Sequence, residues 1–246
     1  MNDLDTLLEK LKIKIFADGA DLESIIKLNE KIFIKGFTTN PSLMKKAGIV
    51  NYKDFALNVL DKIKKKPISF EVFSDDIAEM ERQAEEIASW GENINVKIPI
   101  TNTKKISTIK IIENLSNKGI QCNITAIFTT IQLGEVVKVL NKSTPAILSV
   151  FAGRIADTGL DPIDIMTQSI NIAKTKPKSE ILWASTRELV NIFQANKIGC
   201  QIITVPHEIL SKINNVGKNL EDFSLETVKS FYKDATAAGY KIKLNN

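Results

Sequence analysis

The feature that most constrains the fold is a regular alternation of strand-like and helix-like segments along the chain. Short runs rich in Ile, Val and Phe alternate with amphipathic stretches such as residues 21–33, 75–90 and 186–199. Strands that alternate with helices pair in parallel, because each helix crosses back over the sheet. The eight predicted strands cover residues 13–19, 34–40, 68–73, 94–99, 121–128, 146–153, 180–185 and 201–206.

Eight such units predict an α/β fold, a closed (β/α)₈ TIM barrel. An open doubly wound sheet is the alternative, but no glycine-rich phosphate loop follows the first strand. Asp21 is the expected N-cap of the first helix, and Gly199 is expected to end the helix before the last strand. No linker, repeat or low-complexity run divides the sequence. We therefore predict one domain over residues 1–246, a barrel with an extra C-terminal helix after residue 217.

Polar residues interrupt strands that should be apolar throughout. Parallel strands buried on both faces read as continuous hydrophobic runs. Here polar residues recur two positions apart, as Thr38/Asn40, Ser69/Glu71, Asn95/Lys97 and Asn123/Thr125. Side chains two apart share one face of a strand, which in a barrel is the interior. One pair could be a hydrogen-bonded core cluster, but four pairs indicate a polar cavity near the carboxyl ends, where barrel enzymes place catalytic residues.

Lys97 lies in the apolar segment NINVKIPIT, residues 93–101. Lysine is rarely fully buried, so its ammonium either reaches the surface at a strand end or serves as a reactive amine. A neutral amine can attack a carbonyl and form a Schiff base, and a carboxylate must then move protons. Asp18 and Glu71 are the strand-end carboxylates, and we expect both to be catalytic. The alternatives are a helix cap for Asp18 and an ion pair with Lys97 for Glu71.

Composition excludes several other classes of protein. The net charge is only +4, and the lysines are scattered without interleaved aromatics, so no nucleic-acid surface is expected. The sequence begins without a secretory signal and has no membrane-spanning apolar run, which predicts a cytoplasmic protein with no membrane contact. Cys122 and Cys200 are expected to be buried free thiols. The one histidine, His207, is expected at a helix start or in a loop, and a zinc site is not expected.

Several segments, in this order, match a known family. These segments are FADGADLESI, GFTTNPSLMKKAGI, SFEV, VKIPIT, CNITAIF, LSVFAGRI, ASTRE and GCQIITVP. On them the chain resembles the transaldolases, particularly the short bacterial and archaeal type, which is related to fructose-6-phosphate aldolase. The resemblance implies a (β/α)₈ barrel that transfers a dihydroxyacetone unit in the pentose phosphate pathway. The donor would be fructose 6-phosphate or sedoheptulose 7-phosphate, and the acceptor glyceraldehyde 3-phosphate or erythrose 4-phosphate.

The resemblance also assigns roles to individual residues. It implies Lys97 as the Schiff-base lysine, Asp18 as the acid/base, and Glu71 and Thr125 as the residues that position water. It implies contacts to substrate hydroxyls from Asn40, Asn123 and Ser149, and to phosphate from Arg154, Ser185 and Arg187. Two of only three arginines in the chain thus fall where a planar guanidinium suits a phosphate. Because the iminium is the electron sink, no metal or organic cofactor is expected.

Two alternatives remain open within this architecture. Fructose-6-phosphate aldolases typically have glutamine at the position of Glu71 and tyrosine at that of Phe151, so both residues favour transaldolase. A barrel that only binds sugar phosphates would be favoured by loss of Lys97 or Asp18, and both are present. The departures Ala152 and Thr186, where relatives have valine and phenylalanine, bear on substrate preference. Short family members often form decamers of pentameric rings, so the resemblance implies a homo-oligomer.

Overall fold

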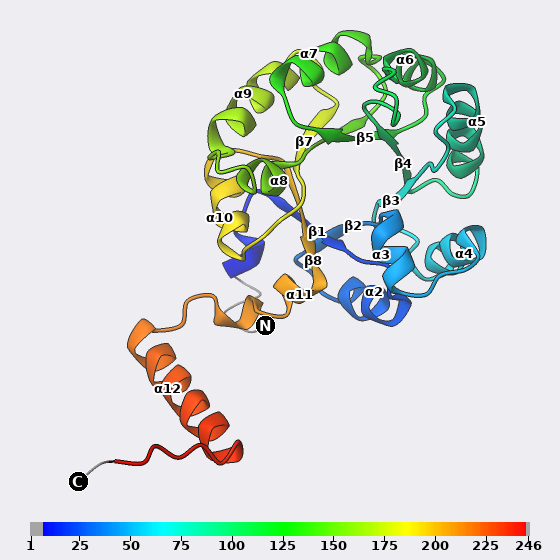
Figure 1. Ribbon diagram of the computed structural model, residues 1–246. Helices are drawn as coiled ribbons and strands as arrows, with labels where there is room; N and C mark the ends of the chain where they lie inside the picture. Colours follow the sequence, from blue (N-terminus) through cyan, green and yellow to red (C-terminus); the bar gives the residue numbers. More distant parts are fainter. Residues whose placement is uncertain (1–6, 245–246) are drawn as a thin grey trace. The chain divides into compact units, whose positions relative to one another are not determined.

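The computed structural model describes residues 7–244, and its main feature is a closed barrel of eight parallel strands (Figure 1). Each strand pairs with its neighbours in sequence, and β1 pairs with both β2 and β8, which closes the barrel. The predicted (β/α)₈ fold is confirmed, and the open sheet is excluded. The strands are β1 Lys14–Asp18, β2 Ile34–Thr38, β3 Ile68–Glu71, β4 Ile94–Pro99, β5 Cys122–Ile127, β6 Ala146–Val150, β7 Ser179–Trp183 and β8 Ile202–Pro206.

Helices follow the strands and form a ring around the barrel (Figure 1). Asp21 caps the first of them as predicted, since its Oδ1 accepts the Ser24 N–H at 2.8 Å. Gly199, at φ +78°, follows α10 and allows the chain to turn into β8. The helices are α2 Leu22–Asn29, α3 Pro41–Lys46, α4 Tyr52–Lys62, α5 Ile77–Ala88, α6 Ile109–Asn117, α7 Thr130–Val139, α8 Ala152–Ala156, α9 Ile163–Ala173, α10 Val190–Lys197 and α11 His207–Leu210.

An apolar cluster fills part of the barrel interior, built from inward-facing strand residues. Its buried members are Phe16, Ile147, Leu182, Ala184 and Ile202, against which Phe151 packs. The Phe16 ring lies so close to the backbone of β2 that a Cβ on Gly36 would stand 2.6 Å from it. This packing holds together strands whose carboxyl ends carry the polar residues of the site, so the site stands on a rigid base.

The chain divides into two compact units, Met1–Ser211 and Lys212–Asn246. The second unit contains the 3₁₀ helix η1 Ile213–Asn215 and the helix α12 Leu220–Ala237, which confirms the expected helix after residue 217. No residue of α12 is buried, and its exposed apolar side chains are Leu220, Phe223, Leu225, Val228, Phe231 and Tyr232. The single domain over residues 1–246 stays a prediction, and residues 1–6 and 245–246 lie outside the described range.

The structure also shows the surroundings of the two cysteines and of the histidine. Cys122 and Cys200 are buried free thiols, as predicted, and burial raises the pKa of each to about 12, so neither is a ready nucleophile. His207 is the first residue of α11, as expected. Among the described helices, none has the length and apolar character needed to cross a membrane.

Candidate active site

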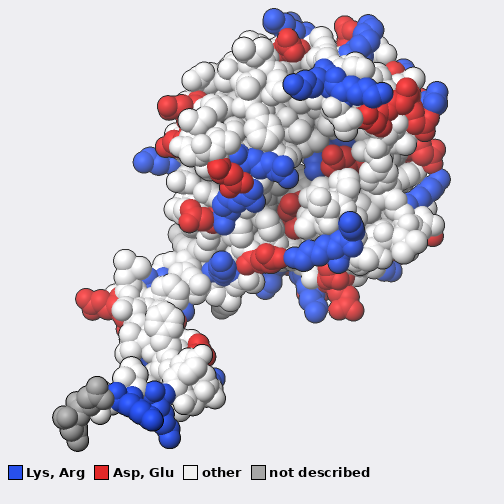
Figure 2. Space-filling model, in the orientation of Figure 1, with Lys and Arg blue, Asp and Glu red and all other residues white. Residues whose placement is uncertain are grey.

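A cavity of about 460 Å³ opens at the carboxyl ends of the strands. Asp18, Thr38 and Glu71 line it as the last residues of β1, β2 and β3. Eight of the ten residues predicted for the site lie in its wall, namely Asp18, Asn40, Glu71, Lys97, Thr125, Ser149, Arg154 and Ser185. Acidic and basic side chains both lie around the hollow on this face of the barrel (Figure 2). The fold therefore brings together residues that are more than 160 positions apart in the sequence.

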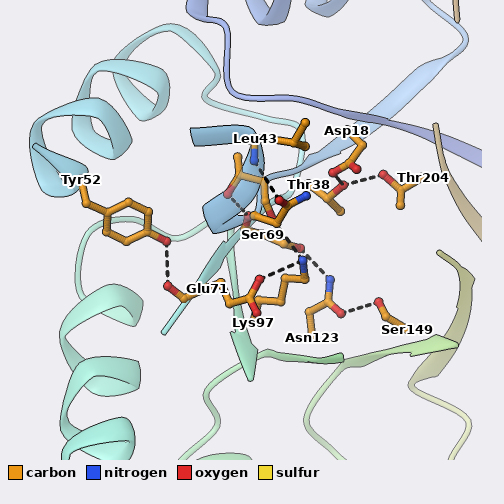
Figure 3. A network of polar contacts seen from close by, with 12 residues as sticks. Asp18, Thr38, Leu43, Tyr52, Ser69, Glu71, Lys97, Asn123, Ser149 and Thr204 are labelled. Carbon is orange, nitrogen blue, oxygen red and sulfur yellow. Dashed lines mark hydrogen bonds and ion pairs between the residues drawn. The ribbon is translucent and has the colours of Figure 1, made fainter. Parts of the chain in front are cut away.

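Lys97 points into the barrel from β4 and is only 7% exposed. Its Nζ lies 3.1 Å from Oε2 of Glu71 and donates a hydrogen bond of 3.1 Å to the carbonyl oxygen of Thr39 (Figure 3). The amine is therefore not a surface group, which excludes the strand-end alternative. The ion pair with Glu71 exists, and it places a proton acceptor beside the amine. A buried amine with a cavity in front of it is arranged as a nucleophile.

Asp18 lies in the same cavity wall, at the end of β1. The hydroxyl of Thr38 donates a hydrogen bond of 2.7 Å to Oδ1 of Asp18, from the directly paired position on β2. Burial raises the pKa of Asp18, and Lys97, the Thr38 hydrogen bond and His207 offset part of this effect. A raised pKa makes a carboxylate a stronger base, which suits a group that must take a proton and later return it. The helix-cap alternative is wrong, because Asp21 caps α2.

A chain of hydrogen bonds joins the polar residues of β3, β5 and β6. Ser149 Oγ donates to Asn123 Oδ1 at 2.6 Å, and Asn123 Nδ2 donates to Ser69 Oγ at 2.9 Å (Figure 3). Asn123 is fully buried and is not among the residues that line the cavity, and its side chain joins Ser149 to Ser69, so its predicted contact with a substrate hydroxyl stays a prediction. Thr125, by contrast, lines the cavity, and its buried hydroxyl has no hydrogen-bond partner among the described residues.

Arg154 contributes a guanidinium group to the cavity wall, and Ser185 lines the same cavity. Arg154 lies on α8, with its guanidinium carbon 5.8 Å from the centre of the Phe151 ring. Ser185 has φ +63°, a strained backbone conformation of the kind often found at functional sites. A Cβ on Gly153 would stand 1.6 Å from the Ser185 carbonyl oxygen, so only glycine allows this approach. Gly153 thereby fixes Ser185 next to the arginine-bearing helix.

Arg187 is the second predicted site residue that the structure places outside the cavity wall. Its Nε donates to Oδ1 of Asp157 at 3.2 Å, and its terminal nitrogen forms an ion pair with Oδ2. Both side chains are about half exposed. The carboxylate of Asp157 therefore occupies the fork that a phosphate would take.

The expectation that all four polar pairs share one cavity is wrong for Asn95. It lines a separate cavity of about 440 Å³, together with Phe16, Ile147 and Lys14, at the amino ends of the strands. The reason is geometric: residues two apart lie roughly 6.5 Å apart along a strand, so Asn95 lies that much farther from the carboxyl end of β4 than Lys97 does. Lys97 reaches the active cavity, whereas Asn95 does not.

Two polar residues close to Asp18 were not predicted as part of the site. Thr204, on β8, lines the cavity, and its hydroxyl lies 2.5 Å from that of Thr38. The signal that could have found it is a threonine in the apolar run IITVP, at an inward position. His207 lies against Gly19, where a Cβ would stand 2.5 Å from its Nε2. Burial lowers the pKa of His207, and the nearby carboxylates of Asp18 and Asp21 offset part of this effect.

The sequence of the chain is similar to those of known proteins. Residues 15–243 match the family model described as Transaldolase/Fructose-6-phosphate aldolase. A probable transaldolase of Nitrosopumilus maritimus is 37% identical over 203 residues, which are 82% of this chain and 87% of that protein. A probable transaldolase of a Thermoanaerobacter species is 35% identical over 233 residues, 94% of this chain and all of that protein. A probable transaldolase of Methanococcus maripaludis is 31% identical over 223 residues, 87% of this chain and 99% of that protein.

Proposed function

The chain belongs to the transaldolase/fructose-6-phosphate aldolase family, and on this premise we propose that it transfers a dihydroxyacetone unit through a Schiff base on Lys97. It is an enzyme of the transaldolase class, a transferase, as the sequence predicts. The proposed donors are fructose 6-phosphate and sedoheptulose 7-phosphate, and the proposed acceptors are glyceraldehyde 3-phosphate and erythrose 4-phosphate. The observation that carries the proposal is the buried Lys97 amine, 3.1 Å from a carboxylate and facing a cavity with Asp18 in its wall.

The first step is attack of the Lys97 amine on the ketone carbon, C2, of the donor sugar. Glu71 is close enough to take the amine proton, directly or through a water molecule. The resulting carbinolamine loses its hydroxyl as water when that proton is returned, and the iminium forms. Thr125 lines the same cavity, and its hydroxyl, which has no partner among the described residues, would orient this water. Lys97 thus supplies the electron sink, and the proposed reaction uses no metal or organic cofactor.

The second step is cleavage of the C3–C4 bond, for which Asp18 is the base. Its carboxylate takes the proton of the C4 hydroxyl, the C4–O bond becomes a carbonyl, and the bonding electrons move into the iminium to give an enamine. The aldose phosphate then leaves. When the enamine carbon attacks the acceptor aldehyde, Asp18 returns the proton to the new C4 oxygen. A raised pKa suits a carboxyl group that must keep this proton between the two half-reactions.

The remaining residues of the wall would hold the sugar in place. Asn40 caps α3 with its side-chain oxygen, which accepts the Leu43 N–H at 3.0 Å, so its amide NH₂ can donate to a sugar hydroxyl. Ser149, held by Asn123, offers a second contact. Arg154 and Ser185 would bind the phosphate. Arg187 would join them by exchanging Asp157 for the phosphate. Fixing the distant phosphate orients the reacting carbons.

An assay of the purified chain with and without an acceptor tests the proposed reaction. We expect fructose 6-phosphate and erythrose 4-phosphate together to give sedoheptulose 7-phosphate and glyceraldehyde 3-phosphate. Unphosphorylated fructose serves as the control, and its turnover should be much slower because the arginine end of the cavity stays empty. Release of free dihydroxyacetone as the main reaction would favour the aldolase alternative. Sugar-phosphate binding without any turnover would favour the non-catalytic barrel.

We predict that Glu71→Gln shifts the reaction toward release of dihydroxyacetone. A carboxylate only accepts hydrogen bonds, whereas the glutamine amide also donates them, so the water beside the Schiff base would turn around. The free dihydroxyacetone formed per transfer should rise about tenfold, the scale of one hydrogen bond. Glu135→Gln, at an exposed position on α7, is the matched control and should leave the product ratio unchanged. An unchanged ratio in Glu71→Gln would remove this residue as the basis for choosing transferase over aldolase.

We further propose that the chain forms a homo-oligomer, through α12 and a second copy of the chain. The exposed apolar side chains of α12, such as Phe223, Val228 and Phe231, are of the kind that a partner surface covers. Light scattering should then give a multiple of the 27.4 kDa chain mass, ten copies for a decamer of two pentameric rings. Phe231→Glu should shift the mass toward the monomer. A monomer at every concentration of the unmodified chain would contradict the proposal.

The proposed function also includes a cytoplasmic location and a place in the pentose phosphate pathway.

A further inference from the structure

Two buried hydroxyl groups stand in line beside the carboxylate of Asp18. Thr38 Oγ1 lies 2.7 Å from Asp18 Oδ1, and Thr204 Oγ1 lies 2.5 Å from Thr38 Oγ1 (Figure 3). The three residues come from β1 and its two neighbours, β2 and β8, at the seam where the barrel closes. Thr38 is 2% exposed and Thr204 is 5% exposed, so bulk water does not compete for these bonds.

The direction of each hydrogen bond follows from the number of hydrogens. A hydroxyl group has one hydrogen, and an ionised carboxylate only accepts. Thr38 therefore gives its hydrogen to Asp18, and Thr204 must donate to Thr38. Neither hydroxyl has another hydrogen-bond partner among residues 7–244.

The line of hydroxyls favours the ionised form of Asp18. If the carboxyl group were protonated and donated to Thr38, then Thr38 would have to donate to Thr204. The hydrogen of Thr204 would in turn have no acceptor, and a buried unpaired donor is costly. With Asp18 ionised, every hydrogen in the line has an acceptor.

We propose that Thr204 is a positioning residue, which acts through Thr38 to hold Asp18 ionised and oriented toward the C4 hydroxyl of the substrate. This inference rests on the proposed function, in which Asp18 is the base. Thr204 contacts no reacting atom in this scheme. Its role is to fix the hydroxyl rotor of Thr38, which could otherwise turn away from the carboxylate.

Other charged and titratable groups around Asp18 also affect the ionisation of its carboxyl group. Lys97 on β4 and His207 on α11 favour the ionised carboxylate, whereas burial opposes it more strongly, and the pKa of Asp18 is raised overall. Glu71 and Arg154 also line the cavity, and Asp21 interacts electrostatically with His207. Removal of the Thr204 hydroxyl leaves these charged groups in place. The change should therefore move the pKa of Asp18 upward and not abolish the base.

The test is the pH profile of kcat/KM for the donor fructose 6-phosphate with saturating erythrose 4-phosphate. We expect Thr204→Val to lower kcat/KM at neutral pH about three- to tenfold, the range for one hydrogen bond. The acidic side of the pH profile, where kcat/KM falls as Asp18 is protonated (the acid limb), should move up by about half to one pH unit. This shift is the three- to tenfold change expressed as a change in pKa. Thr204→Ser, which keeps the hydroxyl, should retain both the rate and the limb. Thr144→Val is the matched control, since it removes a buried hydroxyl that donates to the Ser116 carbonyl outside the cavity wall.

The outcomes separate a positioning role from a structural one. If Thr204→Val lowers kcat/KM equally at every pH, or changes nothing, Thr204 does not act on Asp18. A fall in thermal stability matching that of Thr144→Val, with an unmoved acid limb, would mean that only packing was lost. Borohydride trapping of the Thr204→Val protein gives the independent check. An adduct on Lys97 with a shifted limb supports the inference, whereas no adduct in the unmodified protein overturns the proposed function itself.

Discussion

Lys97→Met should abolish transfer while leaving the fold intact. The substitution replaces the amine by an apolar side chain of similar length, so the barrel interior next to β4 stays filled. Without the amine there is no iminium and no electron sink for cleavage of the C3–C4 bond. Activity should fall by at least about a thousandfold, since loss of a covalent nucleophile costs an enzyme this much or more. The measurement is the rate of sedoheptulose 7-phosphate formation from fructose 6-phosphate and erythrose 4-phosphate.

Stability is the control that makes this result interpretable. Glu71 loses its partner in the variant, but it lines the cavity, where water can reach it. We therefore expect a change in Tm of only a few degrees. Lys138→Met, at an exposed position on α7, should keep full activity. Folded Lys97→Met protein with normal turnover would contradict the Schiff-base mechanism.

Asp18→Asn should block the proton transfer but not the formation of the Schiff base. An amide keeps the shape of the carboxyl group and can still accept the Thr38 hydrogen bond, but it cannot take the C4 hydroxyl proton. General acid–base groups contribute about 10²- to 10⁴-fold, so kcat should fall by that factor. Borohydride should still trap the donor sugar on Lys97. A variant with normal kcat would show that another group is the base.

The same variant should be more stable than the unmodified protein at neutral pH. Burial raises the pKa of Asp18 above its ordinary value of 3.8, so the folded state binds a proton more readily than the unfolded state. The cost of ionising Asp18 is therefore absent below pH 3.8, grows as the pH rises, and is complete above the folded pKa. Asp18→Asn removes this cost. Its Tm advantage should be largest near pH 7 and shrink toward pH 4, and a lower Tm at pH 7 would contradict the assignment.

The chain's local patterns were sufficient to predict the barrel and to place Lys97, Asp18 and Glu71 at the carboxyl ends of its strands, whereas the roles of Ser149, Arg154 and Ser185 came from the resemblance to transaldolases. Periodicity located all eight strands, because buried parallel strands are short apolar runs bounded by helices. Lys97 was predictable because an ammonium inside an apolar strand is costly unless its amine has a chemical use, and the structure finds it buried. Glu71 and Asp18 followed from their position at strand ends, where the active sites of barrels lie.

The parts that were not predicted depend on contacts between distant strands or on exposed charges. Thr204 belongs to the site only because β8 pairs with β1, and this pairing appears when the barrel closes. Asn95 and Lys97 share a face but open into different cavities, because the barrel is several residues deep. Arg187 matches a phosphate-binding position, but Asp157, which lies 30 residues earlier in the chain, forms an ion pair with it. A pair of exposed charges so far apart in sequence leaves no periodic pattern from which it could be predicted.

The most direct test of the central claim is borohydride reduction in the presence of fructose 6-phosphate, followed by peptide mapping. We predict one reduced sugar adduct, on the peptide that contains Lys97, and none in Lys97→Met. That result would establish that the amine in the barrel interior is the nucleophile. Absence of an adduct, or adducts scattered over exposed lysines, would contradict the mechanism and leave a barrel that only binds sugar phosphates.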